Sequence, residues 1–340
     1  MKAKIACNRS VDLLGAVVKV GNIARCATLL IALCTGFVKP SLATDFPMKP
    51  VRLEVGFPPT GGTDVIARLI ANGLSEKWAH PVVVENRVGA EGTIASEFVS
   101  RAQPDGHTLL IVNASFAIPP PFKVAFDPIK SFELVTLMAT QPAVLVVSPS
   151  LKVQNLKDLI ALAKAKPGLL TYGSSGYRTE PTLKMAQFLQ RTGARMLNVP
   201  YRGTGPIITA IMGSEVDMTI IPINTVLQLI NSGQVKALAV STMSRSPILP
   251  TIETIEEAGD LKGFDAGTWY GALAPKGVPK EVIQRIHDDI ESIVRSPSVA
   301  QSLKAQGFIP LPSQTPEALE AQLAGDVKRL TAIIESLEHK

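Results

Sequence analysis

Residue types that could catalyse a reaction are scarce in this chain of 340 residues. The four histidines are scattered, and none has an H-E-x-x-H or other metal-ligand spacing: His80, His107, His287 and His339. His287 lies beside Asp288 and Asp289 on an amphipathic stretch, where a solvated helix face is the expectation. Residues 173–176 read G-S-S-G, but Tyr177 stands where a G-x-S-x-G nucleophile motif needs glycine. The sequence therefore predicts no catalytic residue, no metal site and no cofactor.

Small residues instead gather in loops that could hold an anion. The first loop follows an apolar strand pattern, precedes a helical one, and consists of Phe57, Pro58, Pro59, Thr60, Gly61, Gly62, Thr63 and Asp64. Glycines allow close backbone approach, and the free N–H groups of a first helical turn favour negative charge. An ordinary turn capped by Thr63 or Asp64 is the alternative.

Two more loops lie between a predicted strand and a predicted helix. One contains Ser174, Ser175 and Gly176, whose hydroxyls and amides suit a carboxylate or a hydroxyl group, or else simply cap a helix. The other, residues 200–206, contains Tyr201 and Arg202. Ligands of α/β sheets bind at the carboxyl ends of strands, so the three loops would line one cleft if two lobes faced each other.

The first 43 residues have the order of a secretory signal. A charge-free apolar run, residues 27–38, follows Arg25 and precedes Ser41 and Ala43, which suit a cut after Ala43. An uncleaved N-terminal anchor is the alternative. All three cysteines lie before the cut, and the remaining chain has 28 basic and 28 acidic residues. We therefore expect an exported protein without disulfides, and its zero net charge gives no reason to expect nucleic-acid binding.

Strand and helix patterns alternate along the rest of the chain, which is typical of an α/β fold with mostly parallel sheets. Helices are predicted over 64–78, 279–294 and 316–337, and from a cap at Asn155. The length favours two lobes. We expect lobe 1 to comprise residues 44–145 and 264–340, and lobe 2 residues 146–263.

The loops and several other segments resemble one family of receptors. The matching segments are residues 53–64, 84–90 with Gly92, 104–108, 171–176, 199–203 and 269–275. In this order they resemble the substrate-binding receptors of tripartite tricarboxylate transporters, the TctC or Bug type. The resemblance implies a two-lobed periplasmic binding protein (type II-like) with a hinge of two crossovers. It also implies delivery of a small carboxylate to a membrane carrier with one large and one small subunit.

The resemblance also assigns a ligand site. One ligand carboxylate would be held by residues 57–64 and, opposite them, by Ser174, Ser175 and Gly176, with Tyr201 beside the distal part of the ligand. Thr60 stands where the family usually has glycine or alanine, and Gly56 where it usually has proline. Ile221 occupies a position at which the family often has aspartate. We therefore expect an apolar distal pocket that favours aromatic or aliphatic carboxylates over amino acids.

Two other functions fit the same sequence. A ligand-binding sensory protein that signals to a membrane kinase would look alike, and only its partner would distinguish it. An exported hydrolase would need a nucleophile and a base in reach, and none of the three loops contains a histidine. For the receptor we expect a monomer.

Overall fold

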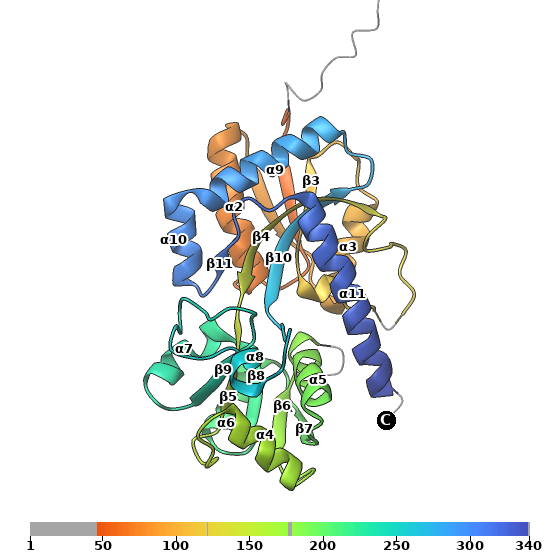
Figure 1. Ribbon diagram of the computed structural model, residues 1–340. Coiled ribbons are helices and arrows are strands. Elements are labelled where there is room, and N and C mark those ends of the chain that lie inside the picture. Colours follow the sequence, from red (N-terminus) through yellow and green to blue (C-terminus); the bar gives the residue numbers. More distant parts are fainter. Residues whose placement is uncertain (1–45, 121, 176–178, 339–340) are drawn as a thin grey trace, which may run out of the picture. The chain divides into compact units, whose positions relative to one another are not determined.

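The computed structural model describes residues 46–120, 122–175 and 179–338 (Figure 1). The first of its two sheets has six strands, which come from both ends of the described chain. In spatial order its strands are β11 (Ile309–Pro310), β4 (Phe132–Gln141), β10 (Thr268–Pro275), β3 (Thr108–Asn113), β1 (Val51–Val55) and β2 (Val82–Asn86). Strand β1 pairs in parallel with β2 and β3, whereas β10 pairs antiparallel with β3 and β4. The sheet is therefore mixed rather than mostly parallel.

Helices cover both faces of this sheet. Alternate side chains of each strand point to opposite faces, and the apolar ones on each face are buried by helices. In β3, Leu109 and Ile111 join one apolar core with α2 (Gly62–Trp78) and α9 (Lys280–Arg295). Figure 1 shows α2 and α9 side by side, although they are far apart in the sequence. Leu110 and Val112 join a second core with α3 (Thr93–Ser100) and α11 (Pro316–Glu338).

Three short helices complete this part of the structure. They are η1 (Ala90–Gly92), η2 (Ala114–Ala117) and α10 (Pro297–Ala305). The first leads into α3, and the second follows β3 directly. Both short 3₁₀ turns therefore lie at the carboxyl ends of strands, where an α/β sheet binds ligands.

A five-stranded sheet organises the middle of the chain. Its order is β7 (Leu197–Pro200), β6 (Thr171–Ser174), β8 (Met218–Pro222), β5 (Ala143–Val147) and β9 (Lys236–Val240). Strand β6 pairs in parallel with β7 and β8, whereas β5 pairs antiparallel with β8 and β9. Only Pro142 separates β4 of the first sheet from β5 of the second, so the chain passes directly from one sheet to the other. Strand β5 is antiparallel to both of its neighbours in the second sheet.

The second sheet is also covered on both faces. One core joins Leu145 to residues of α4 (Leu156–Ala165), α5 (Glu180–Thr192) and α8 (Ile255–Gly259). The other joins Val144 to residues of α6 (Thr204–Met212) and α7 (Ile223–Asn231). Two sheet-and-helix bodies of α/β type confirm the predicted fold class. The lobe boundaries at 145/146 and 263/264 stay predictions.

The predicted helix ends agree with the structure at α4 but not at α2. Asn155 caps α4 by accepting a hydrogen bond from the amide of Asp158, as predicted. Helix α2 begins at Gly62 after Gly61, which has no capping side chain. The alternative reading, a turn capped by Thr63 or Asp64, is therefore not what forms, because both residues lie inside the first turn, where the Asp64 carboxylate has other partners.

Two helical glycines provide a test of this packing. A Cβ added at Gly73 in α2 would lie 2.8 Å from Cγ2 of Ile293 in α9, whereas one added at Gly325 in α11 would meet nothing within 4 Å. Overpacking lowers the free energy of unfolding by about 1–3 kcal/mol, whereas replacing glycine by alanine in a helix raises it by about 0.5–1 kcal/mol. We expect Gly73→Ala to lower the free energy of unfolding and Gly325→Ala to raise it, measured by urea titration. Equal effects would contradict the close α2–α9 contact.

Candidate ligand-binding site

The first loop is a compact turn between β1 and α2. The amide of Gly61 donates to the carbonyl oxygen of Pro58 at 3.3 Å. Thr60 has a φ of 69°, a left-handed conformation that is uncommon for a residue with a Cβ atom. Its amide points back to Asp64 and donates to Oδ2 at 2.9 Å. The loop is therefore closed by hydrogen bonds on both sides of Thr60.

Asp64 holds this turn in place with a buried carboxylate. Arg68 donates through Nε and Nη2, and Asn86 through Nδ2, each at 2.9 Å. Asn86 also donates to the carbonyl oxygen of Phe57 at 2.9 Å. Burial alone would raise the pKa of Asp64, but the hydrogen bonds from Arg68, Asn86 and Thr60 hold it below its usual value. The structure thus gives Asp64 a positioning role, and its direct contact with a ligand stays a prediction.

The first turn of α2 keeps free hydrogen-bond donors. Among the described residues, the amides of Gly62 and Thr63 have no acceptor, because no preceding helical turn exists. Gly62 also requires the absence of a side chain, since an added Cβ would lie 2.5 Å from Oη of Tyr270. Tyr270 is buried in β10 and donates to Oε1 of Gln141 at 2.9 Å. Its hydroxyl therefore fixes the distance between the turn and the sheet.

The second loop begins at the carboxyl end of β6. Ser174 is fully buried, and its Oγ has no hydrogen-bond partner in the described part of the chain. Ser175 is half-buried, and its Oγ lies 3.0 Å from Oγ1 of Thr179. Gly176, the third predicted residue of this loop, lies outside the described residues. The two serines thus supply one orphaned hydroxyl and one hydroxyl in contact with the start of α5.

The third loop lies next to the second, because β6 and β7 are parallel neighbours. Ser174 is paired with Pro200, and the amide of Tyr201 donates to the carbonyl oxygen of Ser174 at 2.8 Å. The Tyr201 side chain is half-buried; partial burial raises its pKa, and Glu215 adds to the rise. Arg202 is exposed. Among the described residues, no hydrogen bond or ion pair joins Tyr201 or Arg202 to the first loop, which follows a strand of the other sheet.

Ile221 lies in the core rather than on a loop surface. It is fully buried in one apolar cluster with Val144 and Ile207. The next residues, Pro222 and Ile223, continue directly into α7. A ligand contact at Ile221 stays a prediction, and it would require the neighbouring side chains to move.

Sequence reasoning missed the residues that position the first loop. Arg68 follows Asp64 by four residues, a helical spacing that could have indicated this ion pair. Asn86 and Gln141 give no such signal, because their contacts depend on which strands are neighbours. Tyr270 lies in a segment of the resemblance, but its contact with Gly62 follows only from the fold.

The prediction of a solvated face at His287 is wrong. The ring is buried against β4, with Nδ1 3.0 Å from the carbonyl oxygen of Val135. Ligand atoms of His287, Asp288 and Glu291 lie within 4.8 Å of one another and could hold a metal ion. The Val135 contact uses one ring nitrogen, so only Nε2 remains for coordination.

Comparisons with known proteins identify the family of this chain. Residues 66–338 match the family described as "Tripartite tricarboxylate transporter family receptor". This chain belongs to that family. It is 35% identical over 310 residues to the "UPF0065 protein in tcbD-tcbE intergenic region" of Pseudomonas sp. (strain P51), covering 91% of this chain and 92% of the relative.

Two solved structures have the same fold as this receptor. One is Rpa4515 of R. palustris with adipate, at a TM-score of 0.73 and 30% identity, covering 86% of this chain and 98% of that one. The other is the periplasmic binding protein BugD, at a TM-score of 0.70 and 31% identity, covering 86% and 98%. The family consists of periplasmic solute-binding receptors. Within the described residues, no helix has both the length and the apolar character to cross a membrane.

Asp64→Asn tests the role of the buried carboxylate. The substitution removes charge-assisted hydrogen bonds, and we expect a loss of about 1–3 kcal/mol in the free energy of unfolding at pH 7. Because the fold lowers the pKa of Asp64, its stabilisation is present above the unfolded value of about 3.9 and is lost as the pH falls through the folded value. The difference between wild type and variant should therefore shrink below about pH 4.

The matched control is Asp158→Asn in α4. Asp158 is exposed and accepts one hydrogen bond, from the amide of Gln154. We expect it to cost less than about 1 kcal/mol, as is usual for an exposed acid at a helix start. A difference for Asp64→Asn that stays constant from neutral to acidic pH would refute the proposed role of its charge.

Proposed function

We propose that this receptor binds a small carboxylate between the first loop and the Ser174–Ser175 loop. The observation that carries the proposal is the pair of free amides at Gly62 and Thr63, held by the buried Asp64 network. A helix N-terminus favours an anion through these donors and through its dipole. The solved relative with adipate supports a carboxylate as the ligand class.

The serine loop supplies the second set of donors in this proposal. The hydroxyl of Ser174 lacks a partner among the described residues, and Ser175 is accessible. Hydroxyls can donate to a carboxylate as readily as they accept from a hydroxyl group. Gly176 and Tyr201 complete the proposed site as the resemblance implies.

The proposal extends to specificity and to the way the receptor works. At the end of β8, Ile221, Pro222 and Ile223 offer no charged side chain, which favours aromatic or aliphatic carboxylates over amino acids. Binding would come from desolvating an anion, with no bond made or broken, so the protein would act as a receptor without enzymatic activity. It would be exported by cleavage after Ala43 and deliver its ligand, as a monomer, to the large and small subunits of a membrane transporter.

Thermal unfolding against a ligand panel tests the proposal. The panel comprises mono-, di- and tricarboxylates, aromatic acids and amino acids, added to residues 44–340. A ligand at 100 times its Kd should add about 2.7 kcal/mol of stability, a rise in Tm of very roughly 5–10 °C. We expect a shift with apolar carboxylates. A shift in Tm with aspartate or glutamate would support the receptor function but contradict the apolar pocket. No shift with any compound would overturn the carboxylate site.

Ser175→Ala then locates the bound carboxylate. Losing a hydrogen bond to a charged group should weaken binding about tenfold or more, measured by calorimetry with the panel ligand that binds best. Ser150→Ala is the control, because Ser150 makes the same kind of hydroxyl contact, at 2.9 Å to Ser148, outside the proposed site. Equal affinities of the two variants would place the ligand elsewhere.

A further inference from the structure

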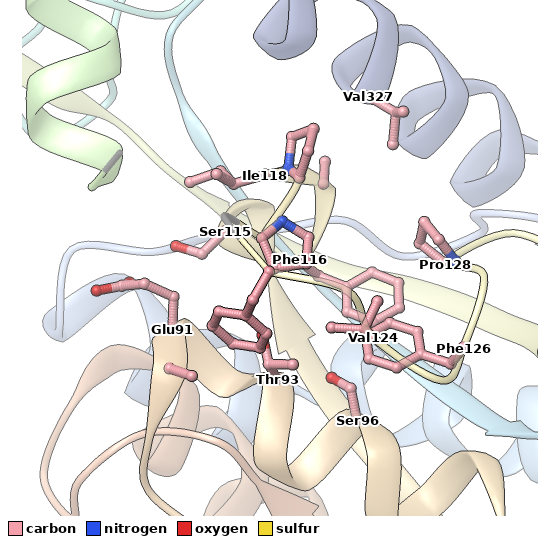
Figure 2. Close-up of a pocket in the computed structure, with 15 residues that line it drawn as sticks. Glu91, Thr93, Ser96, Ser115, Phe116, Ile118, Val124, Phe126, Pro128 and Val327 are labelled. Atoms are coloured by element: carbon pink, nitrogen blue, oxygen red, sulfur yellow. The ribbon is translucent and has the colours of Figure 1, made fainter. Parts of the chain in front are cut away.

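A cavity outside the proposed carboxylate site shares no described residue with it. Its volume is about 630 Å³, within the usual range for small-molecule sites. Figure 2 shows its walls, which come from η1, α3, η2, the following loop and Val327 of α11. Residues 57–64, Ser174, Ser175, Tyr201 and Ile221 do not line it. Any ligand of this cavity would therefore be held by residues other than those of the carboxylate site.

The body of the cavity is apolar and aromatic. Phe116 and Phe126 have nearly parallel rings with centroids 6.2 Å apart, and both pack edge-on against the buried Phe132. The loop that carries Val124 and Phe126 is tied to α3, since the amide of Ala125 donates to Oε1 of Glu97 at 3.0 Å. The aromatic wall is thus fixed by its own packing and hydrogen bonding before any ligand binds.

One edge of the cavity carries a carboxylate, and none of the described lining residues is basic. Fifteen described residues line the cavity, and Glu91 alone among them is charged. In the described part of the chain its carboxylate has neither a hydrogen bond nor an ion pair. The side chain of Glu91 is exposed at this edge; desolvation raises its pKa, and the carboxylate of Glu180, which is itself ion-paired with Lys184, raises it further. Figure 2 places Glu91 and Ser115 on the same side, next to Phe116.

The backbone at Glu91 is held in a costly conformation. Ala90 and Glu91 have φ values of 48° and 52°, left-handed conformations that cost about 1–2 kcal/mol each without glycine. Glu91 thereby stands at the cavity edge without gaining a described partner there. An uncompensated carboxylate beside aromatic rings is the combination that recognises an organic cation, by charge pairing and by cation–π contact.

We propose that this cavity binds an organic monocation: an ammonium group at Glu91 and Ser115 with an aromatic or aliphatic body between Phe116, Phe126 and Val327. The ammonium would donate to the Glu91 carboxylate and to the Ser115 hydroxyl. The body would gain the free energy of removing apolar surface from water. This site is independent of the carboxylate site, so either can fail without the other.

Calorimetry with phenethylamine and its neutral isostere phenethyl alcohol tests the proposal on the purified protein. We expect saturable binding of the amine at concentrations up to about 10 mM, well above a weak Kd of ~1 mM, and much weaker binding of the alcohol. Benzylamine, tyramine and cyclohexylamine widen the search for a body that fits. Absence of saturable binding by all four amines would overturn the proposal.

Three variants assign the amine to the cavity. Glu91→Gln keeps the size of the side chain, removes its charge, and should weaken amine binding about tenfold or more. Glu76→Gln, which removes an exposed carboxylate of α2, should leave the Kd unchanged. Val327→Trp should abolish binding by filling the space, with circular dichroism confirming the fold. Amine affinity unchanged by Glu91→Gln, or equal affinity for the alcohol, would refute the assignment.

Discussion

The buried carboxylate of Asp64 is the interaction on which the predicted ligand site depends. Four donors converge on it from the loop, from its own helix and from the neighbouring strand β2. Since these bonds are made without a ligand, the turn does not have to be ordered when a ligand binds. An ionised carboxylate is negative and only accepts hydrogen bonds, so Asp64 itself would not attract an anion, and its pairing with Arg68 limits the repulsion. Its contribution is to leave the amides of Gly62 and Thr63 fixed and unpaired.

The sheet imposes a second constraint on the same turn. Gly62 lies against the hydroxyl of Tyr270, and Gly56 against the Cα atom of Gly92, at distances where an added Cβ would clash. Strand β10, which carries Tyr270, comes from the far end of the chain and enters the first sheet antiparallel. The position of the first loop thus depends on a segment about two hundred residues away, which couples formation of the site to completion of the fold.

These long-range contacts explain which features could be read from the sequence. Periodicity predicted α2, α9 and α11 to within a few residues, because a helix pattern is local. Strand direction could not be predicted, since the antiparallel pairing of β5 and β10 follows from where the chain crosses between sheets. The loops were found from their glycines and serines, but Asn86, Gln141 and Tyr270 were not. Their roles arise from neighbouring strands, and His287 was misread because its burial against Val135 depends on the sheet below α9.

The first loop offers free amides and the cavity offers the Glu91 carboxylate, so the two proposed sites would prefer ligands of opposite charge. The chain from residue 44 onward has no net charge, so no long-range field draws an anion in. In the proposed site, anion recognition would come from the α2 terminus, equivalent to about half a charge, and this attraction is strong only where water is excluded. Burial is the main cause that raises the pKa of both Tyr270 and Glu91, and Glu180, ion-paired with Lys184, adds to the rise in each. An anion at the first loop would be held by amides in close contact, whereas a cation in the cavity would be held by the Glu91 carboxylate.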